Sequence, residues 1–500
     1  MVKRFSDAGR MAWAFFYWNA RKTLFVLGRR RGICPCQNPS DSGLPLRTGC
    51  EAVQSWHDPA RFARVCPLLA RANDGRWVCR VMASEVRPFW GRAFVAGLGV
   101  ALPLILVVGV ALFAVMRGIG YDVTVRQVFW PPAWNELREV RSRLFFQQAQ
   151  DFFAEGRIRE VMAALSSAQA VNPHDFESGL LLARLYEAGN PAFADVLYGR
   201  LLNEHPLRRA EIARNWLPSL LARNQLEQVA RLARQRLASS PGAEEGVWTH
   251  ALIFSAQQFV RPEWLDKAVA NARVRPAPRG TLALAAKLAR ETDGAKRQAL
   301  LRQTPLEHGF AYDRIFRIER LLAEGLAHDA LQLLAVSRDQ LTDRDVARLA
   351  LAAYAVAGDE VRLDREFAAM LAPGRAVSAA ELNLLALHLV VYPSPTRLDQ
   401  VVAALPRLSE TDAAARVEAA LAVYCAAGVQ ANAAHLRTAR QVMEISLTTK
   451  LRLLDRLEDY FLKGPRPQLP LENILTEVRP LSLELTYALS SRYFSGPPRK

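Results

Sequence analysis

A long run of uncharged residues constrains this chain more than any other feature. It occupies residues 93–116, reads AFVAGLGVALPLILVVGVALFAVM, and is bounded by Arg92 and Arg117. As a helix it extends about 36 Å, enough to cross the hydrocarbon core of a bilayer with some tilt. Aromatic residues stand on both sides, as interfacial anchors do. The run therefore predicts a transmembrane helix, with a helix buried in a protein core as the alternative.

The distribution of charge predicts which side of the membrane each part occupies. The chain has a net charge of +16, and residues 1–92 account for +10 of it. Arg80, Arg87 and Arg92 precede the run closely, whereas only Arg117 and Arg126 follow within twenty residues. The positive-inside rule then places residues 1–92 in the cytoplasm and residues 117–500 outside it, which means the periplasm if the membrane is a bacterial inner membrane.

The basic charge does not favour a nucleic-acid partner. It concentrates beside the apolar run, and no module that combines basic and aromatic residues accompanies it. A second, shorter apolar stretch, MAWAFFYW at residues 11–18, ends before Arg21 and Lys22. That stretch is too short to span a bilayer. It predicts either a helix in the membrane interface or a helix packed in a small N-terminal domain.

Five of the six cysteines lie close together before the apolar run. They are Cys34, Cys36, Cys50, Cys66 and Cys79. Disulfides are rare in a reducing cytoplasm, and four thiolates can hold a structural Zn²⁺ tetrahedrally. We therefore expect four of these five to bind zinc and stabilise a small module, with His57 as a further candidate ligand. An iron–sulfur cluster, or free or lipidated thiols, are the alternatives. Cys425 is expected to be an apolar residue on a helix.

Beyond residue 140 the sequence repeats with a period near 34 residues. Helix-favouring residues dominate there, and two series of turn residues interleave. One series is Pro173, Pro206, Pro241, Pro276, Pro305, Pro373 and Pro406. The other is Gly156, Gly189, Asn224, Gly325, Gly358, Pro393 and Gly428. Each unit is predicted to be a helix, a tight turn, a second helix and a proline stop.

These units resemble the tetratricopeptide repeat, a helix–turn–helix of 34 residues. The second unit carries the resemblance on one set of residues: Leu182, Tyr186, Gly189, Ala194, Tyr198, Leu201 and Pro206. The Trp-x-x-Leu-Gly start of the family is absent, so a divergent α-solenoid is expected. The resemblance implies a mainly α chain whose stacked repeats present a curved surface to a protein or peptide partner.

The expected organisation has five parts: a basic, Cys-rich module (1–92), the transmembrane helix (93–116), a juxtamembrane linker (117–139), the repeats (140–445) and a helical cap with its tail (446–500). No phosphate-binding loop, nucleophile elbow or zinc-protease motif occurs, so neither catalysis nor an organic cofactor is expected. The leading interpretation is a membrane-anchored interaction scaffold. A metal- or redox-responsive membrane regulator, or an accessory subunit of an envelope or secretion assembly, are the alternatives.

Overall fold

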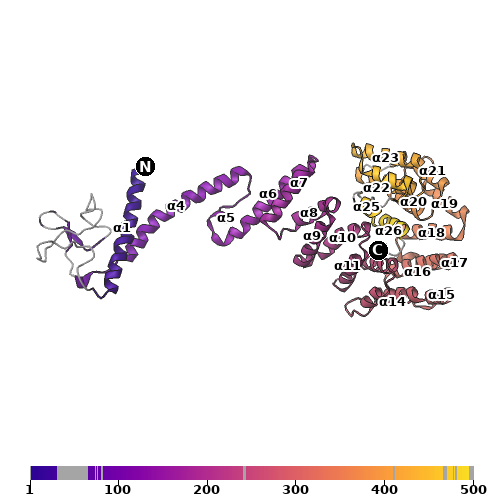
Figure 1. Ribbon diagram of the computed structural model, residues 1–500, viewed down its shortest axis with the longest axis horizontal. Coiled ribbons are helices and arrows are strands. Elements are labelled where there is room, and N and C mark those ends of the chain that lie inside the picture. The colour runs from indigo at the N-terminus through magenta and orange to yellow at the C-terminus, as the bar shows by residue number, and fades with distance from the viewer. Residues whose placement is uncertain are drawn as a thin grey trace. The chain divides into compact units, whose positions relative to one another are not determined.

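The computed structural model describes most of the chain (Figure 1). The described residues are 2–30, 66–71, 73, 75, 77–79, 83–239, 242, 244–408, 412–465, 470–476, 478 and 481–494. They divide into two compact units. The first is Met1–Asp151 with Ala170–Asn172, and the second is Phe152–Gln169 with Pro173–Lys500.

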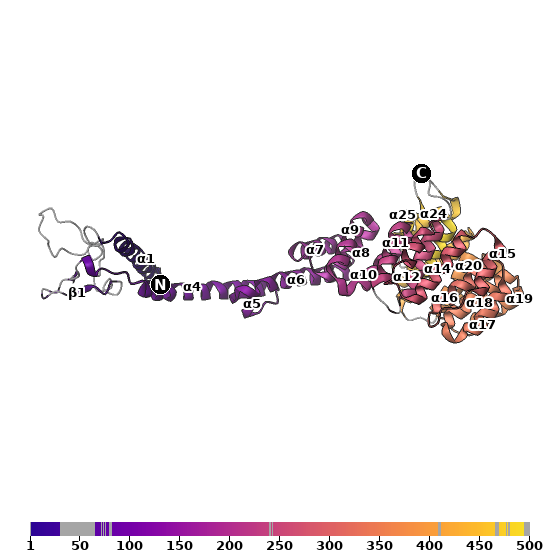
Figure 2. The same ribbon diagram turned by 90° about the horizontal axis from the view of Figure 1, so that it is seen from below.

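The described residues of the first unit lie mainly in three long helices. These are α1 (Val2–Leu27), α4 (Trp90–Ile119) and α6 (Trp134–Ala154). Shorter elements lie between them: β1 (Leu69–Arg71), β2 (Trp77–Cys79), η1 (Ala83–Glu85), α5 (Val125–Phe129) and η2 (Pro131–Ala133). The two strands pair antiparallel, with Leu69 opposite Cys79. Helix α1 packs beside the beginning of α4, as both views show (Figures 1 and 2).

Helix α4 contains the whole predicted transmembrane run and extends it by three residues at each end. It is the one helix among the described residues that is long and apolar enough to cross a membrane. None of its most apolar stretch is buried against the rest of the protein. Gly120 caps the end of the helix with a φ of 101°, a conformation that glycine adopts at little cost. Arg117 lies in the last turn, where a positive charge is favourable. The expectation of a long apolar helix is thus confirmed.

The residues predicted as a linker, 117–139, form the last residues of α4, then α5, η2 and the beginning of α6. Helix α5 folds back beside α4, so that the ring of Phe129 lies directly on the bare backbone of Gly109. The side chains of Val123, Val128 and Ala133 are buried in this fold. Gly109 lies ten residues before the end of α4, about 15 Å along the helix axis. The segment after α4 is therefore a packed structure beside the helix end.

The second unit is a succession of paired helices. Their bounds are α7 (Ile158–Val171), α8 (Phe176–Gly189), α9 (Pro191–Glu204), α10 (Arg209–Ala222), α11 (Leu226–Ser239), α12 (Glu245–Gln258), α13 (Glu263–Val269), α14 (Pro276–Arg290), α15 (Gly294–Gln303), α16 (Ala311–Ala323), α17 (Ala327–Ser337), α18 (Asp343–Ala357), α19 (Glu360–Met370), α20 (Ala379–Val391), α21 (Pro395–Ala404), α22 (Ala413–Val429) and α23 (Ala433–Leu447). Three helices follow: α24 (Leu453–Lys463), α25 (Leu471–Leu475) and α26 (Leu483–Tyr493). Single 3₁₀ turns are η3 (Pro206–Arg208), η4 (Arg338–Gln340) and η5 (Leu405–Arg407).

The turns within the pairs explain much of the sequence period. Gly156, Asn224, Gly325 and Gly358 all have a positive φ, between 56° and 74°. Glycine enters this left-handed region freely, and asparagine tolerates it better than most residues. Gly428 differs, because it lies inside α22 while the turn follows at Ala431, whose φ is 52°. At Gly428 the absent side chain makes room for the ring of Phe461 in α24.

The prolines mark the boundaries between pairs, as predicted. Pro276 opens α14, and Pro206 and Pro406 lie in the 3₁₀ turns η3 and η5. Pro173, Pro305 and Pro373 fall between consecutive helices, whereas Pro241 is outside the described residues. A proline lacks the N–H that a helix interior needs but is tolerated in a first turn or a loop. These prolines therefore stand where one helix pair ends and the next begins.

Neighbouring helices bury the apolar side chains between them. Tyr198 of α9 is fully buried, and its ring stacks on Trp216 of α10 at 5.6 Å between centroids. Its hydroxyl donates a hydrogen bond of 2.7 Å to Glu187 of α8. Tyr186 of α8 makes an edge contact with Phe193 of α9. Packed adjacent helices of this kind define an all-α protein of helical-repeat type, compatible with a solenoid.

Candidate binding surface

The first helices of successive pairs form one continuous side of the second unit. From α12 onwards, each of α12, α14, α16, α18, α20 and α22 contacts the next. These helices and α10 curve around the C-terminal helix α26, which lies in the middle of the arc (Figure 1). We call the side of α10, α12, α18 and α20 that meets α26 the inner face. Stacked helix pairs commonly bind partners on such a curved face.

Helix α26 is seated on the inner face by its apolar side chains. Leu485 and Leu489 are almost completely buried and belong to one apolar cluster with Ala222 of α10 and Leu351 of α18. The same cluster contains most of α20 and α22. One short helix therefore connects repeats that are far apart in the sequence.

An aromatic and polar group surrounds the middle of α26. The ring of Tyr487 meets the edges of His250 and Phe254 of α12, at 4.4 and 4.8 Å between centroids. The Nδ1 atom of His250 lies 3.0 Å from the hydroxyl of Tyr312 in α16. Burial lowers the pKa of His250 and raises the pKa of both tyrosines, because each charged form would lose its hydration. All three groups are thus held neutral near pH 7.

Charged residues complete the inner face. Glu319 of α16 accepts a hydrogen bond of 2.8 Å from Arg348 of α18. Burial opposes the ionisation of Glu319, but nearby positive charge, chiefly on the Arg348 guanidinium, keeps the pKa of Glu319 below its usual range. At the ends of α26, Glu484 pairs with Arg344 of α18, and Arg492 donates to the carbonyl of Val390. Contacts along its whole length hold α26 in place.

The inner face is therefore occupied by a segment of the same chain. Its convergent histidine, tyrosines and carboxylate resemble a reactive centre in composition. Their partners, however, are Tyr487, Tyr312 and Arg348, so the structure uses these groups to seat α26 and to join helices. A second buried group behaves in the same way: Asp313 accepts from Thr281 and Arg317, both at 2.9 Å.

Many arginines join one repeat to the next. Ion pairs whose partners are separated by about one repeat include Arg208–Glu177, Arg223–Asp195, Arg275–Glu245, Arg302–Asp329, Arg348–Glu319 and Arg397–Asp364. The exposed pairs among them each contribute at most about 1 kcal/mol, but the spacing of the whole set follows the helical repeat. Acidic partners within the second unit therefore neutralise these arginines.

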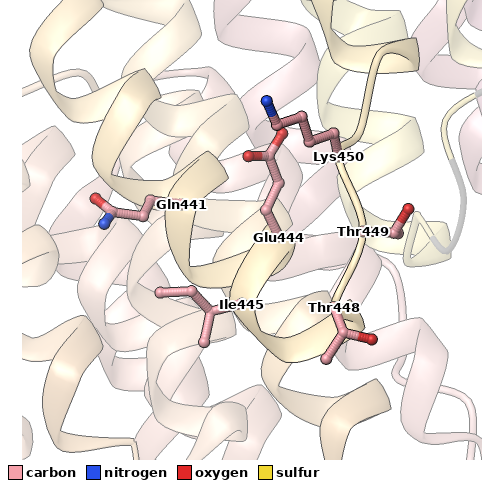
Figure 3. A pocket seen from close by; sticks show the side chains of 6 residues that line it. All are labelled: Gln441, Glu444, Ile445, Thr448, Thr449 and Lys450. Carbon is pink, nitrogen blue, oxygen red and sulfur yellow. The ribbon is translucent and has the colours of Figure 1, made fainter.

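A shallow hollow of about 300 Å³ lies at the end of α23 (Figure 3). Its lining residues are Gln441, Glu444, Ile445, Thr448, Thr449 and Lys450. The Glu444 carboxylate already accepts hydrogen bonds from Arg440 and from the backbone N–H of Leu451, at 2.9 and 3.0 Å. Ile445 is exposed beside it. The Lys450 ammonium also lines the hollow, but one exposed lysine beside a carboxylate that is already bonded defines no ligand chemistry.

Of the predicted zinc ligands, Cys66 and Cys79 lie among the described residues. Cys34, Cys36, Cys50 and His57 lie outside the described residues. Cys66 is a buried free thiol whose sulfur accepts a hydrogen bond of 2.8 Å from Lys22 of α1. The carbonyl of Cys66 accepts from the N–H of Leu69, which pairs with Cys79, so the hairpin brings both cysteines to one end. Within the described part of the chain, no three His, Cys, Asp or Glu side chains could together hold a metal ion.

Comparisons of the chain with protein-family models, with curated proteins and with solved structures give no match.

The inner face illustrates what could not be found from the sequence. The sequence predicts a helical cap over residues 446–500, and α26 lies within that range. No local signal shows that it contacts α10, more than 250 residues earlier in the chain. The spacing of Leu485 and Leu489 indicates an apolar face, but many helices carry such a face.

Proposed function

We propose that this protein is a membrane-anchored interaction scaffold without catalysis. One observation carries the proposal: a 30-residue apolar helix with its side chains exposed is joined to a folded unit of paired helices. Exposed apolar surface of this size is unfavourable in water and favourable in lipid. Helix α4 would be the single span, and the paired helices, a divergent tetratricopeptide-like solenoid, would hold a protein or peptide partner.

The span has a direct test. Val107 and Val108 are exposed near the middle of α4, and replacing both with arginine places two charges at the bilayer centre. Each charge costs about 2.5–3.5 kcal/mol during insertion. The double variant should leave the membrane fraction, whereas Leu207→Arg in the second unit should not. Retention of the double variant during alkaline carbonate extraction contradicts the span.

Orientation is tested separately. The excess of arginine before α4 supports a cytoplasmic N-terminus and a periplasmic second unit. Alkaline phosphatase fused after Lys500 should then be active, because that enzyme works only outside the cytoplasm. An inactive fusion in a well-inserted protein reverses the orientation and removes the argument for a reducing environment around the cysteines.

Partner binding requires a comparison between two chains. The full chain should enrich a protein partner after crosslinking in intact cells. A chain truncated after residue 123 keeps α4 but lacks the paired helices, and it should enrich no such protein. Equal enrichment by both chains contradicts the role assigned to the repeats.

The zinc site remains part of the proposal. Five clustered cysteines in a reducing compartment favour a structural metal, which a small module with little core would need. The purified full chain should carry about one zinc, and Cys34→Ser should lower that content. If zinc content instead varied with oxidant and changed partner capture, the metal- or redox-responsive regulator would be the better description. A partner that proves to be an envelope or secretion complex would make the chain an accessory subunit.

A further inference from the structure

One face of α1 exposes large apolar side chains to solvent. Trp13, Phe16, Tyr17, Leu24 and Leu27 are all exposed, between 43% and 74%. With 3.6 residues per turn, these positions and the intervening Ala20 return to one side of the helix. We call this row the α1 stripe. On the opposite side, Phe15, Trp18 and Lys22 are buried, so α1 is packed on one face and uncovered on the other.

The α1 stripe lies next to the first turn of α4. The ring of Phe16 contacts the ring of Trp90 at 5.7 Å between centroids. The indole N–H of Trp90 donates to the hydroxyl of Thr23 at 2.9 Å, and the backbone N–H of Phe89 donates to Asn19 at 2.7 Å. These contacts fix α1 against the beginning of α4. The exposed surface of the stripe is therefore continuous with that of Trp90, where the apolar surface of α4 begins.

The chemistry of the stripe suits the boundary between headgroups and acyl chains. Tryptophan and tyrosine prefer this depth because each combines an apolar ring with a polar group. Arg21 lies over the rings of Tyr17 and Trp18, at 5.2–5.6 Å from their centroids. A guanidinium beside an apolar row can contact lipid phosphates while the row enters the acyl region.

We propose that α1 is an in-plane membrane helix whose exposed stripe binds the bilayer interface on the side where α4 begins. The proposal rests on the span proposed above, and it adds a second membrane contact outside that span. The stripe's occupant is lipid, since its surface continues that of α4 and its residues match an interface. The contact would hold the beginning of α4 and the hairpin of β1 and β2 close to the membrane surface.

A photoreactive side chain placed on the stripe tests this directly. Benzoyl-phenylalanine replaces Leu24 in the full chain, reconstituted in vesicles of phosphatidylcholine and phosphatidylglycerol. After irradiation, trypsin cleavage at Lys22 and Arg29 releases the probe on one short peptide. We expect that peptide to gain the mass of one phospholipid. Leu27 serves as a second probe position on the same row.

Two control positions make the outcomes distinguishable. Leu102 in α4 is 59% exposed and Val196 in α9 is 65% exposed, against 70% for Leu24. Lipid adducts at Leu102 and Leu24 but not at Val196 support the proposal. Adducts at Leu102 alone, or a crosslink from Leu24 to a second copy or another protein, overturn it while the span stands. No adduct at Leu102 overturns the span and the proposal together.

Discussion

Helices α4 and α20 have similar composition and opposite surroundings. Both consist largely of Ala, Leu and Val, yet the apolar stretch of α4 is unburied whereas most of α20 is buried. Length separates them first, since α4 has 30 residues and α20 has 13, about 45 and 20 Å. Packing separates them further, because α18, α21, α22 and α26 all contact α20. The apolar surface of α20 is covered by neighbouring helices, whereas that of α4 is left uncovered.

The largest expected effect compares one leucine from each helix. Leu389 of α20 is 0% exposed and Leu106 of α4 is 61% exposed. Leu389→Ala leaves a cavity and should lower the free energy of unfolding by about 2–5 kcal/mol. Leu106→Ala should change it by less than about 0.5 kcal/mol, because no packing is lost. Urea unfolding of the full chain in lipid nanodiscs measures both. Equal losses would show that protein, rather than lipid, covers α4.

The second effect concerns His388, a titratable residue inside α20. Burial, with a smaller contribution from the Arg397 guanidinium, lowers the pKa of His388 to about 4. Its pKa in the unfolded chain is about 6.5. Between these values the unfolded state binds more protons, so stability is complete above pH 6.5 and is lost as the pH falls towards 4. The total loss is about 3 kcal/mol, since one pKa unit corresponds to about 1.36 kcal/mol.

Unfolding measured at pH 6.5 and at pH 5 should reveal about 2 kcal/mol of this loss. His388→Gln should remove that part of the pH dependence. His328→Gln, on the exposed side of α17, should leave it unchanged. If His388→Gln keeps the wild-type slope, groups other than His388 cause the acid sensitivity.

A third, smaller effect uses a glycine on the helix that packs against α20. Gly428 of α22 lies under the ring of Phe461, which is itself buried. A methyl group there must displace the ring, so Gly428→Ala should cost about 1–3 kcal/mol. Gly199 of α9 has free space, and Gly199→Ala should stabilise the helix by up to about 1 kcal/mol. In thermal unfolding, Gly428→Ala should melt below wild type and Gly199→Ala above it. The reverse order of melting temperatures is incompatible with this packing.

The smallest effect uses the corresponding glycine of α4. Gly109 also lies under a phenylalanine ring, Phe129 of α5, but that ring is only half-buried and can move. Gly109→Ala should leave global stability within about 0.5 kcal/mol of wild type. It should instead raise hydrogen exchange in residues 121–134. The control variant Gly99→Ala should leave that exchange unchanged, because nothing lies close to Gly99. Unchanged exchange would mean that α5 does not rest on α4.

Local features of the repeats could be predicted because they depend on the backbone alone. Gly325 and Gly358 were expected at turns and have the positive φ that glycine permits. Gly428 was placed in the same series although it serves a different purpose, the approach of Phe461. Tyr198 is buried at a position where the resemblance requires a large residue, but its stacking partner Trp216 comes from the next pair. A period identifies buried positions without identifying what fills the space beside them.

By itself, the sequence determined the long apolar helix, the all-α composition and the regular turns. Each of these follows from local rules: charge and length, helix propensity, and the backbone freedom of glycine and proline. Only the tertiary structure decided that α26 fills the inner face, that Phe129 rests on Gly109, and that α1 leaves a stripe uncovered. These results depend on which surfaces meet after folding. Apolar burial is non-directional, so an apolar face alone does not specify its partner.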